Sequence, residues 1–192
     1  MKKLLANKRE GAQKGFSLVE MLIVIAIIGL LSSTILASLS VARQKARDIK
    51  RIAEVGQITR ALNLYFDSHQ TYPSTTPTCS PACSRPSDDD VAIQLLSQLG
   101  LLPTTPIPML GGANTYYVYR GVYNNSGVLT DCDAGAPAGT VCSGYSLGIS
   151  LERDNNPVLE NDADRSVGTF YGANPDCLSS TAGTELCYDL KM

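Results

Sequence analysis

A stretch of 22 residues, from Met21 to Ala42, contains no charged side chain and begins with a run of large apolar residues. As an α-helix it would rise about 33 Å, which is enough to cross a hydrocarbon core about 30 Å thick. The chain can therefore cross a membrane once, near its N-terminus. Any water-soluble part has to be built mainly from the residues that follow this segment.

The residues before the apolar stretch are predominantly basic. Residues 1 to 15 hold Lys2, Lys3, Lys8, Arg9 and Lys14, opposed by Glu10 alone. By the positive-inside rule, this excess of lysine and arginine keeps the N-terminus in the cytoplasm. The bulk of the chain is then expected on the other side of the membrane.

An ordinary secretory signal peptide is the alternative interpretation, because Ala37–Ala42 supplies small residues of the kind that a signal peptidase accepts. Three features oppose it. The apolar run is longer than is usual for a signal peptide, it starts with the carboxylate of Glu20, and the helical pattern continues beyond Ala42 without a break. We therefore expect the apolar segment to be retained.

The residues around Glu20 carry a family resemblance. A basic leader ends at Gly15, Phe16 follows, and Glu20 stands four residues further on, just before the apolar helix. This pattern resembles the class III signal of type IV pilins and of the pseudopilins of type II secretion systems. The resemblance implies that a prepilin peptidase cuts between Gly15 and Phe16 and that the new amine of Phe16 is N-methylated. Glycine suits such a cut, because its backbone can lie close to a protease active site.

The charge of Glu20 is costly in a membrane. An ionised carboxylate in a helix that enters the bilayer costs about 2.5 to 3.5 kcal/mol on insertion scales and persists where a partner offsets the cost. The resemblance implies that the partner is the amine of Phe16, on the same or a neighbouring chain, and that this contact aligns subunits during assembly. The alternative is a glutamate that merely reaches water at the headgroup level.

Beyond the apolar stretch, large apolar residues recur at steps of three and four, which places them on one side of a helix. They are Ile52, Val55, Ile58, Leu62, Tyr65 and Phe66. The first proline is Pro73, so the sequence predicts one helix from about Ser17 to about Ser68, roughly 52 residues and about 78 Å long. Its first half is apolar all round and its second half is amphipathic, as in the long helix of the pilin fold.

Between the two halves, the segment 43–51 holds five basic residues. We interpret it as a solvated face of the helix, with contact to lipid headgroups as the alternative.

The expected architecture is an α+β pilin fold, in which the long helix packs on a small antiparallel sheet. Its parts are a leader (1–15), a transmembrane or filament-core half of the helix (16–42), an amphipathic half (43–72) and a globular head (73–192). Segments 115–120 and 145–152 alternate and are rich in β-formers, so both are predicted strands. Segment 91–100 is predicted to be a short helix, because acidic residues precede it and its last residue is glycine.

All six cysteines follow the apolar stretch, and they form three local pairs. The pairs are Cys79 with Cys83, Cys132 with Cys142, and Cys177 with Cys187. An even number of cysteines in such a position predicts disulfides outside the cytosol. We favour sequential pairing, although sequence alone cannot choose among the connectivities that six cysteines allow, and a zinc cluster is the weaker alternative.

Several functional classes find little support in the sequence. Beyond residue 60 the basic residues are few and scattered, so nucleic acid is not expected as a direct ligand. His69 is the only histidine, no glycine-rich phosphate loop is present, and no nucleophile has a recognisable base, so we expect no enzyme and no cofactor. Asp154, Asp162 and Asp164 are interpreted as residues of exposed turns, with calcium binding as the alternative and no metal site assigned.

The sequence thus predicts a structural subunit of a type IV pilus or pilus-like filament, stored in the membrane and assembled by packing of N-terminal helices. The resemblance implies related minor pilins, a prepilin peptidase, a membrane platform protein and a cytoplasmic ATPase as partners, with membrane lipid around the subunit before assembly. The expected location is the cell membrane and then a surface pilus or a periplasmic pseudopilus. The alternatives are a pseudopilin of a type II secretion system and a monomeric, membrane-anchored extracellular binding domain.

Overall fold

The computed structural model describes residues 15–75, 91–104, 106, 117–133, 135–175, 177–178 and 183–192. The chain divides into two units, Met1–Ala42 and Arg43–Met192. The predicted pair Cys79 and Cys83 and the predicted acidic cap of the short helix lie outside the described residues.

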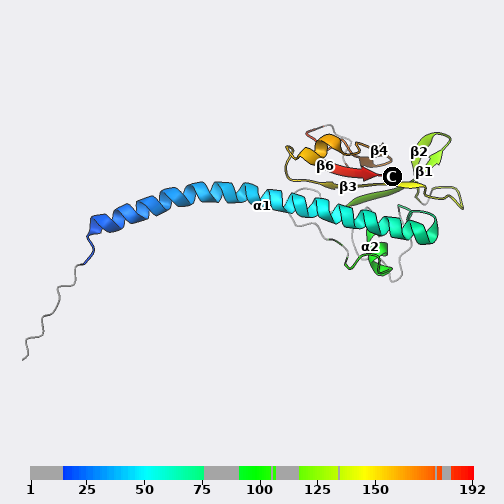
Figure 1. The fold of residues 1–192 in the computed structure, drawn as a ribbon. Helices are drawn as coiled ribbons and strands as arrows, with labels where there is room; N and C mark the ends of the chain where they lie inside the picture. The colour runs from blue at the N-terminus through cyan, green and yellow to red at the C-terminus, as the bar shows by residue number, and fades with distance from the viewer. Residues whose placement is uncertain are drawn as a thin grey trace, which may run out of the picture. The chain divides into compact units, whose positions relative to one another are not determined.

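Helix α1 runs from Leu18 to His69, 52 residues without interruption (Figure 1), and confirms the predicted long helix to within a residue at each end. In the first unit the large apolar side chains that the structure describes are exposed, among them Leu18, Ile25, Leu31 and Val41. By length and composition this part of α1 is able to cross a membrane. The helix ends where Gln70 takes a positive φ of 56° and donates its N–H to the carbonyl of Phe66, which closes the last turn.

The amphipathic half of α1 carries the core of the second unit. Val55, Ile58 and Leu62 are fully buried, and Ile52 and Phe66 pack at the edge of the same cluster. The predicted apolar stripe is therefore confirmed as core. Helix α2, Val91–Gln98, adds the buried side chains of Ala92, Ile93 and Leu96 to that core, in agreement with the predicted short helix.

A four-stranded antiparallel sheet forms the centre of the second unit, in the order β2-β1-β3-β6. Its strands are β1 (Val118–Asn125), β2 (Val128–Asp131), β3 (Gly144–Ser150) and β6 (Cys187–Lys191). The two predicted strands correspond to β1 and β3, whereas β2 and β6 were not predicted.

Both faces of this sheet are covered, although the sequence predicted only the face on the helix. Alternate side chains of β1 and β3, among them Tyr119 and Leu147, join the core with α1. On the opposite face, Val118 and Val122 pack with Val167 and Phe170 from a second, smaller layer. That layer contains strands β4 (Ser166–Val167) and β5 (Phe170–Tyr171), and Figure 1 labels β4 beside the sheet. The 3-10 helix η2 (Pro157–Asn161) instead places Leu159 in the core with α1.

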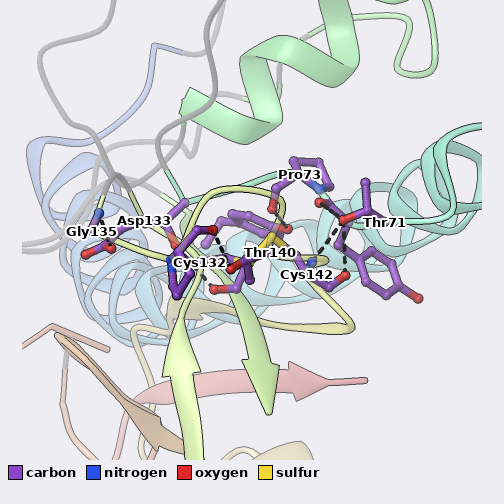
Figure 2. Close-up of a disulfide and its surroundings, with 12 residues drawn as sticks. Thr71, Pro73, Cys132, Asp133, Gly135, Thr140 and Cys142 are labelled. Atoms are coloured by element: carbon purple, nitrogen blue, oxygen red, sulfur yellow. Dashed lines mark hydrogen bonds between the residues drawn. A yellow bond between two sulfur atoms is a disulfide. The ribbon is translucent and has the colours of Figure 1, made fainter. Parts of the chain in front are cut away.

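The two disulfides in the described part of the chain follow the sequential pairing favoured from the spacing. Cys132–Cys142 lies against the segment that follows α1, as Figure 2 shows. The N–H of Tyr72 donates to the carbonyl of Cys142 over 2.9 Å, and the N–H of Thr75 donates to that of Cys132 over 2.7 Å. Cys177–Cys187 lies in the smaller core and joins β6 to the loop after β5.

An ion cluster joins α1 to the end of β3. The guanidinium of Arg47 binds the carboxylate of Glu152 through two bonds of 2.6 Å, and Arg51 reaches the same carboxylate over 3.1 Å. The fully buried Asp48 accepts the backbone N–H of Glu152 over 2.8 Å. Arg47 and Arg51 hold the pKa of Glu152 below its usual value, while burial raises that of Asp48. The prediction that segment 43–51 is a solvated face is therefore wrong for Arg47, Asp48 and Arg51.

A second cluster of carboxylates holds the segment between η2 and β4 against β6. The buried carboxylate of Asp189 accepts the backbone N–H groups of Asp164 and Arg165, and the backbone N–H of Asp189 donates to Asp162 over 3.2 Å. Burial raises the pKa of Asp162 to about 7, with the neighbouring carboxylates acting in the same direction. The pKa of Glu185 is raised to about 7, also mainly by burial.

We predict that Glu152→Gln lowers the free energy of unfolding by roughly 2 to 4 kcal/mol, because it removes the carboxylate that Arg47 and the buried Arg51 share and leaves Arg51 with the longer contact to Asp48. Urea unfolding of the purified chain measures the loss. The same substitution at the exposed Glu160 is the matched control and should change the free energy of unfolding by less than about 0.5 kcal/mol. Equal effects at the two positions would contradict a stabilising role for the cluster.

A second prediction concerns pH. In the folded chain the carboxyl group of Asp162 keeps its proton up to about pH 7. In an unfolded chain it loses that proton at about pH 4. This contribution to stability is therefore complete below the unfolded pKa and is lost as the pH rises through 7. With EDTA present, we expect the urea midpoint to fall between pH 5.5 and pH 8, and to fall less in Asp162→Asn. Asp154→Asn, at an exposed position, should keep the wild-type pH dependence; an unchanged pH dependence in Asp162→Asn would contradict the assignment.

Candidate assembly site

The start of α1 is closed by a reciprocal pair of hydrogen bonds between Ser17 and Glu20. The backbone N–H of Glu20 donates to the Ser17 hydroxyl oxygen over 3.2 Å, and the backbone N–H of Ser17 donates to Glu20 Oε2 over 2.8 Å. This is a capping box, which satisfies two N–H groups that a helix start leaves without intrahelical partners. The sequence signal was present as Ser-x-x-Glu before an apolar run, but it was not used in predicting the role of Glu20.

The capping box explains how the chain tolerates a carboxylate, that of Glu20, next to its apolar stretch. A carboxylate at a helix N-terminus interacts favourably with the helix dipole, and here it also accepts a backbone N–H. The cost of placing it next to lipid is thus partly offset within the chain, before any partner binds. A carboxylate has about four acceptor positions, so the bond to Ser17 leaves capacity for a second donor.

The surroundings of this carboxylate are apolar and open. Phe16, Met21, Ile23 and Val24 line a shallow groove together with Glu20, and the Phe16 side chain is 80% exposed. The N–H that Glu20 binds belongs to the residue directly after Phe16. Cleavage before Phe16 would therefore create a positive amine one residue away from the carboxylate's existing contact.

The predicted cleavage point lies outside the helix. Gly15 and Phe16 both precede α1 and are exposed. A Cβ placed on Gly15 would meet no atom within 4 Å, so the fold described here does not itself require glycine at this position. A requirement for glycine would come from the peptidase, as the sequence resemblance implies.

His69 has a structural environment at the end of α1. Its ring stacks on Tyr65 with a centroid separation of 4.0 Å, and Nδ1 lies 2.7 Å from the Ser68 hydroxyl oxygen. These contacts fit the predicted role of an ordinary residue at a helix end.

The acidic residues weighed as calcium ligands fall in two places. Carboxylate oxygens of Asp162 and Asp164 lie with one of Asp189 within 4.8 Å of one another, and such oxygen donors suit a hard cation. Asp154 is not part of this group and instead lines a groove with Glu160 and other residues. Asp154 and Asp164 are exposed, as predicted, whereas Asp162 is half-buried.

Comparison with known proteins supports the sequence resemblance. Residues 11–36 match the family model described as the prokaryotic N-terminal methylation motif. Three relatives are each named type II secretion system core protein G. The one from Pectobacterium carotovorum subsp. carotovorum is 35% identical over 63 residues, which is 33% of this chain and 40% of the relative. Those from Escherichia coli (strain K12) and Vibrio cholerae serotype O1 are 35% identical over 63 residues and 26% identical over 83 residues.

The similarity is confined to part of each chain. The alignment with the Escherichia coli relative covers 33% of this chain and 43% of the relative. The alignment with the Vibrio cholerae relative covers 43% of this chain and 57% of the relative. The chain thus spans about half the length of the curated relatives it matches. No solved structure shows significant similarity to it. The chain therefore carries a prokaryotic N-terminal methylation motif and is homologous, over part of its length, to proteins named type II secretion system core protein G.

Proposed function

We propose that the chain is a structural subunit of a pilus-like filament, assembled from its N-terminal helices. The observation that carries this proposal is the carboxylate of Glu20, held by Ser17 at the start of a helix whose first half exposes its described large apolar side chains. The methylation motif over residues 11–36 supports the same function. Because several relatives are named as type II secretion core proteins, a pseudopilus is favoured over a surface pilus.

Before assembly, the membrane stores the subunit. The apolar half of α1 spans the bilayer once, and the head folds on the non-cytoplasmic side, where its disulfides form. A prepilin peptidase removes residues 1–15 and leaves Phe16 with a free, methylated amine. The retained helix then holds the mature subunit in the membrane.

During assembly, helix contacts between subunits replace lipid contacts. The Glu20 carboxylate keeps its bond from Ser17 and receives the Phe16 amine of a neighbouring subunit as a second donor. In an apolar environment this charge pair is stronger than it would be in water, and it exists in only one alignment of the two helices. A platform protein, an assembly ATPase and minor subunits complete the proposed machinery. No catalytic activity is assigned to the chain.

A tethered binding domain is the rival function. It would use the same membrane span but would not need Glu20 or a free Phe16 amine, so substitutions at the start of α1 distinguish the two functions.

We predict that Glu20→Ala reduces filament yield at least tenfold while processing at Gly15 continues. Filaments sheared from cells that express the chain with its assembly machinery are counted by electron microscopy, and processing is followed by the mass of the subunit. Ser17→Ala is the control, because it removes the hydroxyl of the capping box, at a cost of about 1 kcal/mol, but keeps the carboxylate. It should retain most filaments.

Two outcomes would contradict this assignment. Normal filaments in Glu20→Ala would remove the proposed charge pair. Equal losses in Glu20→Ala and Ser17→Ala would mean that Glu20 serves only to cap the helix. Glu20→Gln, which can still accept a hydrogen bond from Ser17, should behave like Glu20→Ala if charge is what matters.

A further inference from the structure

The segment that follows the apolar stretch is divided by the fold into two groups of basic residues. Arg47 and Arg51 are paired with Glu152. The remaining three, Arg43, Lys45 and Lys50, have exposed side chains. Lys50 makes one longer contact, 3.6 Å to Glu54, and its side chain remains 51% exposed. Three cations are therefore available to a partner outside the chain.

Their place along α1 fixes their distance from the apolar stretch. Arg43 directly follows Ala42, the last residue of that stretch, and Lys45 is three residues beyond Ala42. At 1.5 Å per residue, the backbone of Lys45 is about 4.5 Å past the end of the stretch and that of Lys50 about 12 Å. The headgroup layer on each side of a bilayer is roughly 5 to 8 Å thick, and lysine side chains reach several ångströms along a helix.

The surface between two of these cations, Arg43 and Lys50, is apolar. The stems of Arg43, Arg47 and Lys50 line a shallow groove with Ala46. Ile49, at 57% exposure, directly precedes Lys50 and adds an exposed apolar side chain beside this groove. Cations mixed with exposed apolar groups are typical of a helix face at a membrane interface.

We propose that Arg43, Lys45 and Lys50 form a basic collar that binds the headgroups of anionic phospholipids on the non-cytoplasmic surface of the membrane. The proposal rests on the membrane-anchored state of the proposed function. It specifies which lipid surrounds the subunit before assembly. Each basic residue near an anionic surface is worth about 1 kcal/mol, or roughly fivefold in binding.

The collar gains importance when the leader is removed. Before the cut, the basic residues of segment 1–15 hold the cytoplasmic side of the span. After the cut only the Phe16 amine remains there, and the three collar residues become the main basic flank of the span. The mature subunit is then held by anionic lipid from the opposite side, and it has to give up those headgroups when it enters a filament.

A second copy of the chain is the competing occupant, since its acidic head could also meet three cations. The collar's position next to the span and its exposed Ile49 favour lipid, because an acidic protein surface would leave that apolar side chain unmatched.

The test is the lipid preference of the full chain, reconstituted in vesicles of phosphatidylcholine with 30% phosphatidylglycerol. Native mass spectrometry counts the lipids of each class that remain bound. The triple variant Arg43→Gln, Lys45→Gln, Lys50→Gln should lower the preference for phosphatidylglycerol at least tenfold relative to wild type. The control Arg60→Gln, Arg153→Gln, Lys191→Gln removes the same charge from positions far along the chain from the span and should lower it less than twofold. The leader is identical in all three proteins.

Each other outcome overturns the proposal. An unchanged preference in the collar variant would mean a solvated face, and an equal loss in the control would mean a nonspecific effect of net charge. Chemical cross-linking between copies of the chain is measured on the same proteins. If the collar variant loses these cross-links and keeps its lipid preference, the collar binds a second subunit. Resistance to alkaline extraction reports insertion separately. A chain that alkaline treatment extracts from these vesicles would overturn the membrane anchor of the proposed function and the collar with it.

Discussion

The apolar surface of the first half of α1 has no cover within its own unit, and the rest of the account depends on this constraint. Each buried square ångström of apolar surface is worth about 25 cal/mol, so a helix with this many exposed aliphatic side chains is strongly unfavourable in water. Two environments can cover it, lipid and other helices of the same kind. A subunit that moves from the first environment to the second satisfies the constraint at both stages without refolding.

The second unit meets the opposite requirement, because it has to be stable in water. Its sheet is buried on both faces, its α1 segment is tied to β3 by the Glu152 cluster, and the turn after α1 is held by the Cys132–Cys142 loop. These contacts join residues about 60 to 105 positions apart. They make the amphipathic half of α1 part of the head, so the head fixes one end of the helix while the other remains available for assembly.

The parts of the fold that sequence predicted best are those governed by local rules. The limits of α1 follow from apolar periodicity and the absence of proline before Pro73, and two strands follow from alternation. The capping box could also have been predicted, because Ser17 and Glu20 have the Ser-x-x-Glu spacing of this motif. The pairing of Arg47 and Arg51 with Glu152 could not, because a basic run carries no sign of a carboxylate about a hundred residues away. The second layer was missed because strands of two residues, β4 and β5, give no periodic signal.

Mass spectrometry of the N-terminus of the mature chain, isolated from cells with a prepilin peptidase, tests the central claim most directly. We expect a chain that begins at N-methylated Phe16 and retains the whole apolar helix. An intact Met1, or a start near Ser38 or Arg43, would contradict it, because the amine that should meet Glu20 would then not exist.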